Sequence, residues 1–188
     1  MHRIDTRGIS QLATNETCFT VLTEEGRVFT WGDARGVHSL GREPAADEPA
    51  DVPGVVGALD GLVVTKIASG GGMSAALAES GDIYIWGAGN VEGLEGVPAE
   101  VGLVDLPVGE VNVVDVAVGA GHMLVLTEEG EAWAAGENGN GQLGGEAGGQ
   151  SGWRRWKGSW NGQVRRVFSG PFAWCSLVLV ERGDHEEE

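Results

Sequence analysis

A short pattern of apolar and polar positions recurs along the chain. Residues 21–26 read Val-Leu-Thr-Glu-Glu-Gly, and residues 125–130 carry the same six letters. Looser copies stand at 76–81 and 179–183. Each copy joins an apolar stretch to a polar turn with glycine, which predicts a β-hairpin. The first three copies are 55 and 49 residues apart, so the repeat unit has the length of a propeller blade.

The repeat also predicts the strands of each unit. Strands that are apolar on both faces, such as 73–78 and 122–127, are expected to be buried on both sides. A short outer strand is expected in each glycine-rich loop of about twenty residues, and the one helical turn is expected near 43–51. The remaining predicted strands are 9–15, 27–31, 63–70, 82–86, 111–119, 131–135 and 164–170. The pattern therefore predicts an all-β protein of radially stacked small sheets.

Composition narrows the class of protein. Glycine supplies 33 of 188 residues without a three-residue period, which excludes collagen and favours short strands joined by turns. A hydrophobic content of 41% predicts a real core, and a net charge of −16 disfavours nonspecific nucleic-acid binding. No signal peptide and no membrane-spanning apolar run is visible, so we expect a cytoplasmic protein, with the nucleus as the alternative.

The two cysteines are Cys18 and Cys175, which stand at nearly equivalent repeat positions. Both are expected to be buried and too far apart for a disulfide.

The best-formed unit resembles a known repeat. Residues 119–130 read Gly-Ala-Gly-His-Met-Leu-Val-Leu-Thr-Glu-Glu-Gly, and residues 136–144 read Gly-Glu-Asn-Gly-Asn-Gly-Gln-Leu-Gly. Together they look like one repeat of the regulator of chromosome condensation family, whose fold is a β-propeller that normally closes with seven blades. The positions that carry the resemblance are Gly26, Trp31, Gly32, Gly81, Trp86, Gly87, His122, Gly130, Gly136, Gly141, Leu143 and Gly144.

The array has fewer blades than a closed ring. The units are expected at 9–63, 64–112, 113–163 and 164–188, with residues 184–188 as an acidic disordered tail. Such a partial β-propeller would leave sheet edges exposed. Three arrangements fit: a fragment of a larger propeller, which we favour, a self-capped array, or a homodimer in which two chains close one ring.

The sequence offers no catalytic constellation. Residues 139–144 fit G-x-G-x-x-G, but the glycines that follow cannot open the helix that a dinucleotide site needs. We find no P-loop, nucleophile elbow, paired cysteines or histidines at metal-ligand spacing. His122 is expected to be a hydrogen-bonded histidine near the propeller axis. The chain is therefore predicted not to be an enzyme and to use no cofactor or metal.

One segment departs from the acidic background. From 147 to 180 there is no Asp or Glu but five basic residues, and the rest of the chain carries 7 basic against 28 acidic groups, a net −21. Tryptophan and arginine dominate binding hot spots. The hypothesis is an arm that docks an acidic protein partner through Trp153, Arg154, Arg155, Trp156, Lys157, Trp160, Arg165 and Arg166. The alternative is that Trp153 and Trp156 lie on an outer strand and pack on the neighbouring blade; single-stranded nucleic acid is disfavoured by the −21 elsewhere.

These observations predict a non-catalytic protein–protein interaction module or regulatory scaffold. The family resemblance implies two alternatives. One is guanine-nucleotide exchange on a small GTPase, which needs no acid, base or nucleophile, although the family's wedge cannot be placed on residues here. The other is an adaptor of a tRNA- or translation-factor-modification complex. No membrane partner is expected.

Overall fold

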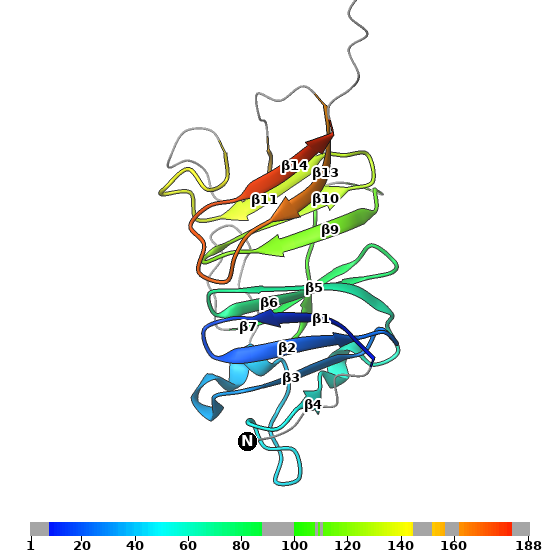
Figure 1. Cartoon of the computed structure of the whole chain (residues 1–188), viewed down its shortest axis with the longest axis vertical. Coiled ribbons are helices and arrows are strands. Elements are labelled where there is room, and N and C mark those ends of the chain that lie inside the picture. The colour runs from blue at the N-terminus through cyan, green and yellow to red at the C-terminus, as the bar shows by residue number, and fades with distance from the viewer. Residues whose placement is uncertain are drawn as a thin grey trace, which may run out of the picture.

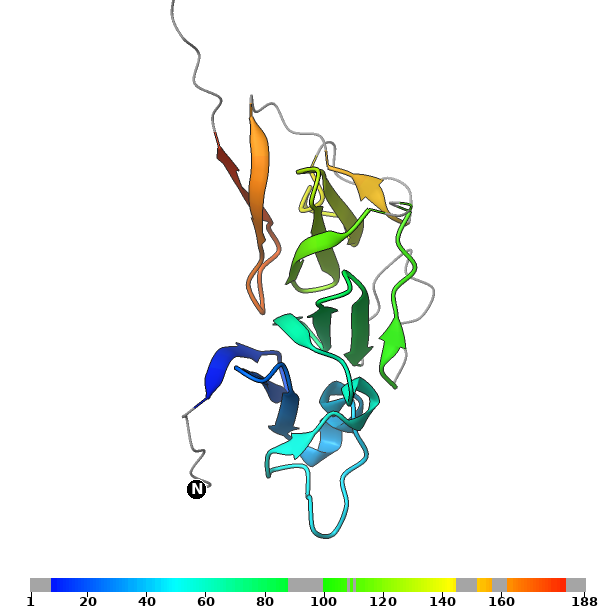
Figure 2. The ribbon, with the colours of Figure 1, turned by 90° about the vertical axis from the view of Figure 1, so that its right-hand side faces the viewer.

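The molecule is an open array of small antiparallel sheets. The computed structural model describes residues 8–87, 100–107, 109, 111–144, 152–156 and 162–181. These residues form three four-stranded sheets, here called blades 1 to 3, and a two-stranded half-blade. Figure 1 shows them stacked along the long axis, and Figure 2 shows that they follow an arc with the first strand of each sheet on the inner side. The prediction of an all-β partial propeller is confirmed.

Each blade is a meander that starts at the inner side of the arc. Its strands pair with their neighbours in chain order. The expected outer strands are present as the fourth strand of each blade. Blade 1 contains β1 (Ile9–Thr14), β2 (Cys18–Thr23), β3 (Val28–Gly32) and β4 (Gly54–Val55); blade 2 contains β5 (Val64–Gly70), β6 (Met73–Ala78), β7 (Ile83–Gly87) and β8 (Gly102–Leu103); blade 3 contains β9 (Val113–Val118), β10 (His122–Thr127), β11 (Ala132–Gly136) and β12 (Arg154–Arg155); the half-blade contains β13 (Gln163–Phe168) and β14 (Leu177–Glu181).

The repeated glycines have two structural tasks. The hairpin glycines adopt left-handed backbone angles, with φ of 78°, 89° and 79° at Gly26, Gly81 and Gly130. These values are accessible to glycine at little cost, which explains why each turn ends in this residue. The glycines that end the third strands lie against the main chain that begins the second strand, where a Cβ would overlap backbone atoms; they are Gly32, Gly87 and Gly136.

The helical turns lie where the sequence did not predict them. Two short 3₁₀ helices are present among the described residues, η1 (Ala34–Leu40) and η2 (Gly57–Leu59), whereas 43–51 is not helical. Asp33 begins η1 because its carboxylate accepts a hydrogen bond from Arg35 N at 2.8 Å. Gly41, with φ of 62°, ends it. Because these signals are local side-chain caps rather than a hydrophobic period, the prediction near 43–51 was wrong.

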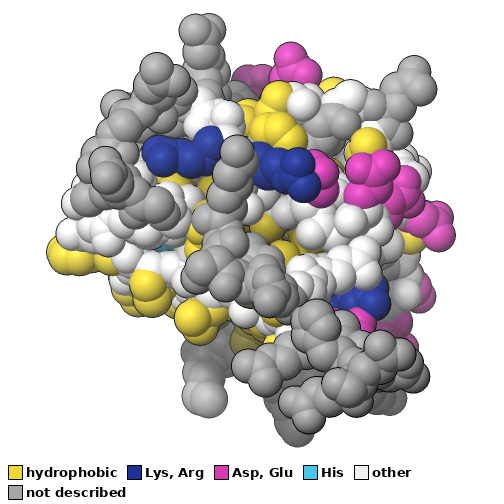
Figure 3. Space-filling view, turned by 90° about the horizontal axis from the view of Figure 1, so that it is seen from above, with side chains coloured by type: hydrophobic (Ala, Val, Ile, Leu, Met, Phe, Trp, Pro, Cys, Tyr) yellow, Lys and Arg dark blue, Asp and Glu magenta, His cyan; other side chains and the backbone are white. Residues whose placement is uncertain are grey.

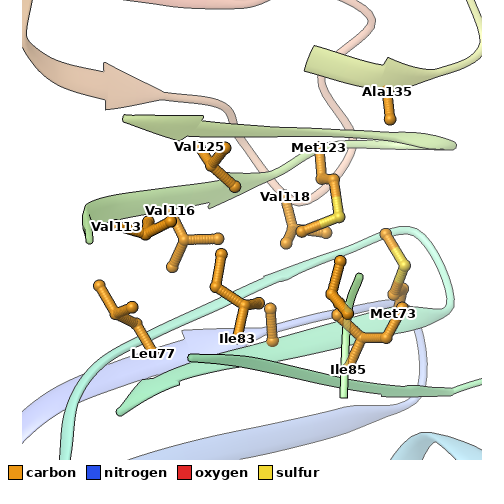
Figure 4. Packing of buried hydrophobic residues seen from close by; sticks show 12 residues of the cluster. Met73, Leu77, Ile83, Ile85, Val113, Val116, Val118, Met123, Val125 and Ala135 are labelled. Atoms are coloured by element: carbon orange, nitrogen blue, oxygen red, sulfur yellow. The ribbon is translucent and has the colours of Figure 1, made fainter. Parts of the chain in front are cut away.

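The hydrophobic core lies between the blades rather than within one. In the largest cluster, Met73, Leu77 and Ile83 of blade 2 face Val116 and Met123 of blade 3 (Figure 4). Two similar clusters join blade 1 to blade 2 and blade 3 to the half-blade. Strands β6 and β10 are buried at every position, as their apolar sequences predicted. Each blade therefore depends on its neighbours for stability.

The two cysteines differ in environment. Both are free thiols. Cys18 is buried at the start of β2, and burial raises its pKa to about 11. Cys175 is exposed in the loop between β13 and β14, so the prediction of burial was wrong for this residue. Its repeat position is the same, but the half-blade has no third strand among the described residues to cover it.

Candidate protein interface on the last two blades

The predicted arm is, where the structure describes it, the outer strand of blade 3. Residues Arg154 and Arg155 form β12 and pair with β11. Trp153, on one side, packs against the core between blades 2 and 3. Trp156, on the other side, packs against the core between blade 3 and the half-blade. The structure thus gives both tryptophans a packing role, while their contact with a partner remains a prediction; Lys157, Trp160 and the 184–188 tail lie outside the described residues.

Three of the four described arginines of this region are exposed. Arg155 Nη2 lies 2.7 Å from Glu131 Oε1, and its side chain stays 54% exposed. Arg154, beside it in β12, is half-buried. Arg165 and Arg166 are exposed on β13, and Arg165 Nε donates to Glu181 Oε2 at 2.5 Å. Because Trp153 and Trp156 on either side pack against two cores, β12 holds its two arginines at the outer edge of blade 3, and Arg154 and Arg155 are called the rim below.

Seen from the half-blade end, the molecule combines basic and apolar side chains. Figure 3 shows Lys and Arg side chains in a row across this end, with hydrophobic side chains beside them. The sequence does not mark the apolar members of this surface, because Leu177 and Leu179 alternate with half-buried valines in an apolar strand, and Phe172 and Trp174 lie in the loop before it. The exposed hydrophobic residues of this region are Phe168, Phe172, Trp174, Leu177 and Leu179.

A column of polar side chains follows the inner strands. The inner strand of each sheet has a register shift (a β-bulge) near its second residue, in its pairing with the next strand of the sheet. The residue that follows this shift along the inner strand is Gln11 in β1, Lys66 in β5, Asp115 in β9 and Arg166 in β13. Such bulges re-aim a side chain. Gln11 Oε1 accepts from the main-chain N of Ile67 at 2.9 Å, and so Gln11 ties blade 1 to blade 2.

Asp115 connects three sheets. Its Oδ1 forms an ion pair with Lys66 Nζ of blade 2, and its Oδ2 accepts from Val167 N of the half-blade at 3.1 Å. Burial, and then the positive charge of Arg166, lower the pKa of Lys66 to about 8, while the contact with Asp115 opposes this shift. The side chain of Arg166 forms no ion pair or hydrogen bond with another described residue, while its main chain pairs with Leu179.

His122 fixes the half-blade to blade 3. It is fully buried, and its Nδ1 lies 3.2 Å from Ala120 O. Its Nε2 lies 3.0 Å from the hydroxyl of Ser176 and 3.3 Å from that of Ser169. Burial lowers the pKa of His122, so the neutral ring donates to the carbonyl and accepts from a serine. The two serines were not predicted, because nothing in the sequence marks them.

The segment with the G-x-G-x-x-G pattern is a turn that anchors a core residue. Asn138 Oδ1 accepts from Leu143 N at 2.9 Å, and Leu143 is buried against the half-blade. Gln142 Oε1 accepts from Asn140 N at 2.9 Å within the same turn. Gly141 and Gly144 both have positive φ, and Gly144 lies against the indole of Trp156. The motif thus supports packing of the outer strand.

The inner side of the arc is a shallow groove of about 350 Å³. Its lining is mixed, with Leu12, Ile67 and Val116 beside Lys66 and Ser69. No group of three or more His, Cys, Asp or Glu residues within the described ranges could hold a metal ion. In the same part of the chain no helix is long and apolar enough to cross a membrane.

Comparison with known proteins identifies the repeat. The family described as "Regulator of chromosome condensation (RCC1) repeat" matches residues 113–142. The mitochondrial RCC1 domain-containing protein RUG3 of Arabidopsis thaliana is 34% identical over an alignment of 143 residues, with 72% of this chain and 32% of RUG3 covered. Mouse RCC1 domain-containing protein 1 is 31% identical over 177 residues, with 72% of this chain and 46% of the relative covered. The chain thus spans less than half the length of these relatives.

Solved structures show the same fold. Human WBSCR16 superposes with a TM-score of 0.74 at 24% identity, covering 95% of this chain and 46% of that protein. Yeast RCC1 (Prp20), in its complex with Kap60, gives a TM-score of 0.70 at 22% identity, with 96% and 43% covered. At this identity the likeness is one of fold.

Proposed function

Because this chain belongs to the regulator of chromosome condensation (RCC1) repeat family, as a partial set of three blades and a half-blade, we propose that it is a non-catalytic protein-interaction module. Its partner is a protein with an acidic surface, and the rim formed by Arg154 and Arg155 contacts it. The observation that carries this proposal is the position of the two arginines on a strand that Trp153 and Trp156 fix in two cores. A fixed strand loses little entropy on binding.

Two further observations support a binding role. Five basic residues and no acidic residue lie between 147 and 180, while the rest of the chain carries a net −21, so the rim is the place where an acidic partner meets least repulsion. His122, the buried histidine of the described residues, already uses both ring nitrogens to hold the half-blade.

The test is affinity capture from native lysate with the full chain and two charge-matched variants. Arg154→Glu with Arg155→Glu changes the rim, and Arg27→Glu with Arg35→Glu makes the same change in net charge on blade 1. We expect the rim variant to lose a protein that the control variant retains, and the purified protein to bind directly and more weakly at high salt. Equal binding by both variants would remove the rim from the proposal.

The identity of the captured protein decides between the functions that this fold could have. If it is a small GTPase, nucleotide release measured by stopped flow with and without the chain tests the exchange activity that the family implies. Unchanged release would leave binding as the function.

A further inference from the structure

No described strand pairs with the far edge of β12. This strand comes last in the sheet order of blade 3 and pairs with β11 on one side only. Figure 2 shows it on the outer side of the arc, away from the inner strands. Blade 2 and the half-blade already flank blade 3, so further blades at either end of the array would leave this edge as it is.

The strand register decides which main-chain groups of β12 point outward. Trp156 N donates to Ala132 O at 2.7 Å, and Arg155 is paired with Trp133. In an antiparallel ladder, pairs that share hydrogen bonds alternate with pairs that share none, so the N–H and C=O of Arg155 point away from β11. Arg155 therefore presents one donor and one acceptor to a strand that adds to this edge.

The two arginines of the rim lie on opposite faces of blade 3. Arg155 is opposite Trp133, which packs against the core between blades 2 and 3. Arg154 is opposite Ala134, which belongs to the core between blade 3 and the half-blade. Paired residues place their side chains on the same face, and successive residues of a strand alternate. A partner must therefore reach both faces of one strand to contact both arginines.

The arginine pair distinguishes β12 from the other outer strands. The residues equivalent to Arg154 and Arg155 are Gly54 and Val55 in β4, and Gly102 and Leu103 in β8. Charged side chains on an edge strand usually deter pairing with another strand. Here two positive charges deter a neutral or basic strand, whereas an acidic strand gains ion pairs across the ladder. The edge of β12 therefore selects for an acidic strand.

We propose that the acidic partner adds an extended segment to the outer edge of β12, antiparallel to it, and that this segment carries two consecutive acidic residues. The inference rests on the proposed function, since both place an acidic partner at the rim. The first acidic residue lies opposite Arg155 and exchanges both main-chain hydrogen bonds with it. The second lies opposite Arg154, on the other face. In such strand addition, main-chain hydrogen bonds supply affinity and alternate side chains supply specificity.

Glu131 competes with the first acidic residue of the added strand. Its Oε1 lies 2.7 Å from Arg155 Nη2, and its side chain is 27% exposed. The incoming carboxylate shares Arg155 with Glu131, and the two negative charges repel each other. Glu131→Gln should therefore tighten the binding of an acidic strand by about threefold.

The first test is the binding of labelled peptides to the full chain, measured by fluorescence anisotropy at low salt. The two probes are threonine-rich peptides with two glutamates each, either adjacent or separated by one threonine. Adjacent glutamates reach opposite faces of an added strand, whereas separated glutamates share a face and reach one arginine. We expect the adjacent pair to bind about fivefold more tightly. The difference should disappear in Arg154→Gln, which leaves Arg155 alone on the strand.

The second test separates strand pairing from charge attraction. N-methylation of the first of the two adjacent glutamates removes the N–H that donates to Arg155 O, so binding should weaken by about fivefold. N-methylation of the second glutamate is the matched control, because its N–H points away from β12 in this register. The control peptide should bind like the unmodified one.

The outcomes decide the proposal without deciding the function. Equal binding of the adjacent and separated pairs, or equal effects of the two N-methyl groups, overturns strand addition. A chain that binds neither peptide, or that binds single-stranded oligothymidine more tightly than either, also overturns it. The proposed function is decided by the lysate capture: a partner lost with Arg154→Glu and Arg155→Glu, together with equal binding of the peptides, keeps the rim as a binding site and removes the added strand.

Discussion

Asp115 Oδ2 accepts a hydrogen bond from the main-chain N of Val167 at 3.1 Å, so a carboxylate of blade 3 holds the inner strand of the half-blade. The same carboxylate pairs through Oδ1 with Lys66 of blade 2 and is almost fully buried. One side chain thus joins three sheets. Its burial makes this link sensitive to the loss of either partner.

Replacing Asp115 should therefore destabilise the whole array. Asp115→Ala leaves Lys66 and Val167 N without their acceptor, and we expect the free energy of unfolding to fall by about 3–5 kcal/mol. Asp115→Asn keeps one acceptor oxygen and should cost about 1–2 kcal/mol. Urea unfolding at neutral pH measures both. The addition of Lys66→Met to Asp115→Asn should recover part of the loss; no recovery would show that the hydrogen bond, not the ion pair, carries the stability.

The sequence predicted the turns and strands of each repeat more fully than the contacts between repeats or the exposed surface. The hairpin glycines and the buried strands follow from local rules, because each unit repeats the same turn chemistry and the same apolar run. The links between units do not follow, because Asp115 and Val167 are 52 residues apart and meet only in the folded arc. The exposure of Leu179 was equally hidden, since an apolar strand looks the same whether or not a blade covers it.

The stability of the half-blade should fall in mild acid. Burial lowers the pKa of His122 below its ordinary value of about 6.5, so the unfolded chain binds the proton more readily. The contribution of His122 is fully present above pH about 6.5 and is lost as pH falls toward the lowered folded-state pKa. Urea unfolding from pH about 7.5 to about 5.5 should show a loss of stability. His122→Gln does not titrate in this window, so its stability should change less over the same range; parallel curves would exclude His122 as the cause.

Gly136 should tolerate no side chain. Its φ is 115°, and a Cβ would overlap Gly121 O and lie 2.6 Å from His122 Cα. The Gly136→Ala variant combines backbone strain with a clash against main-chain atoms, and we expect a loss of about 3 kcal/mol in thermal or urea unfolding. Gly139→Ala is the control in the same repeat, since nothing lies within 4 Å of its Cβ position, and should change stability by less than about 0.5 kcal/mol. Equal effects would argue against the role of the strand-end glycine.

Substitutions of the tryptophans around β12 should lower stability, whereas substitutions of its arginines should leave stability nearly unchanged. Trp156 packs in the core against the half-blade, so Trp156→Ala should lower the free energy of unfolding by about 3 kcal/mol. Arg155→Ala breaks an exposed ion pair with Glu131 and should lower it by about 0–1 kcal/mol.

Trp153 adds a sharper test, because its Nε1 is buried without a hydrogen-bond partner among the described residues. Trp153→Phe removes that unsatisfied donor and keeps most of the apolar surface, so urea unfolding should show little or no loss beside the roughly 3 kcal/mol expected for Trp153→Ala. If Trp153→Phe is as costly as Trp153→Ala, the indole N–H makes a contact that stabilises the strand, and the rim is held by more than packing.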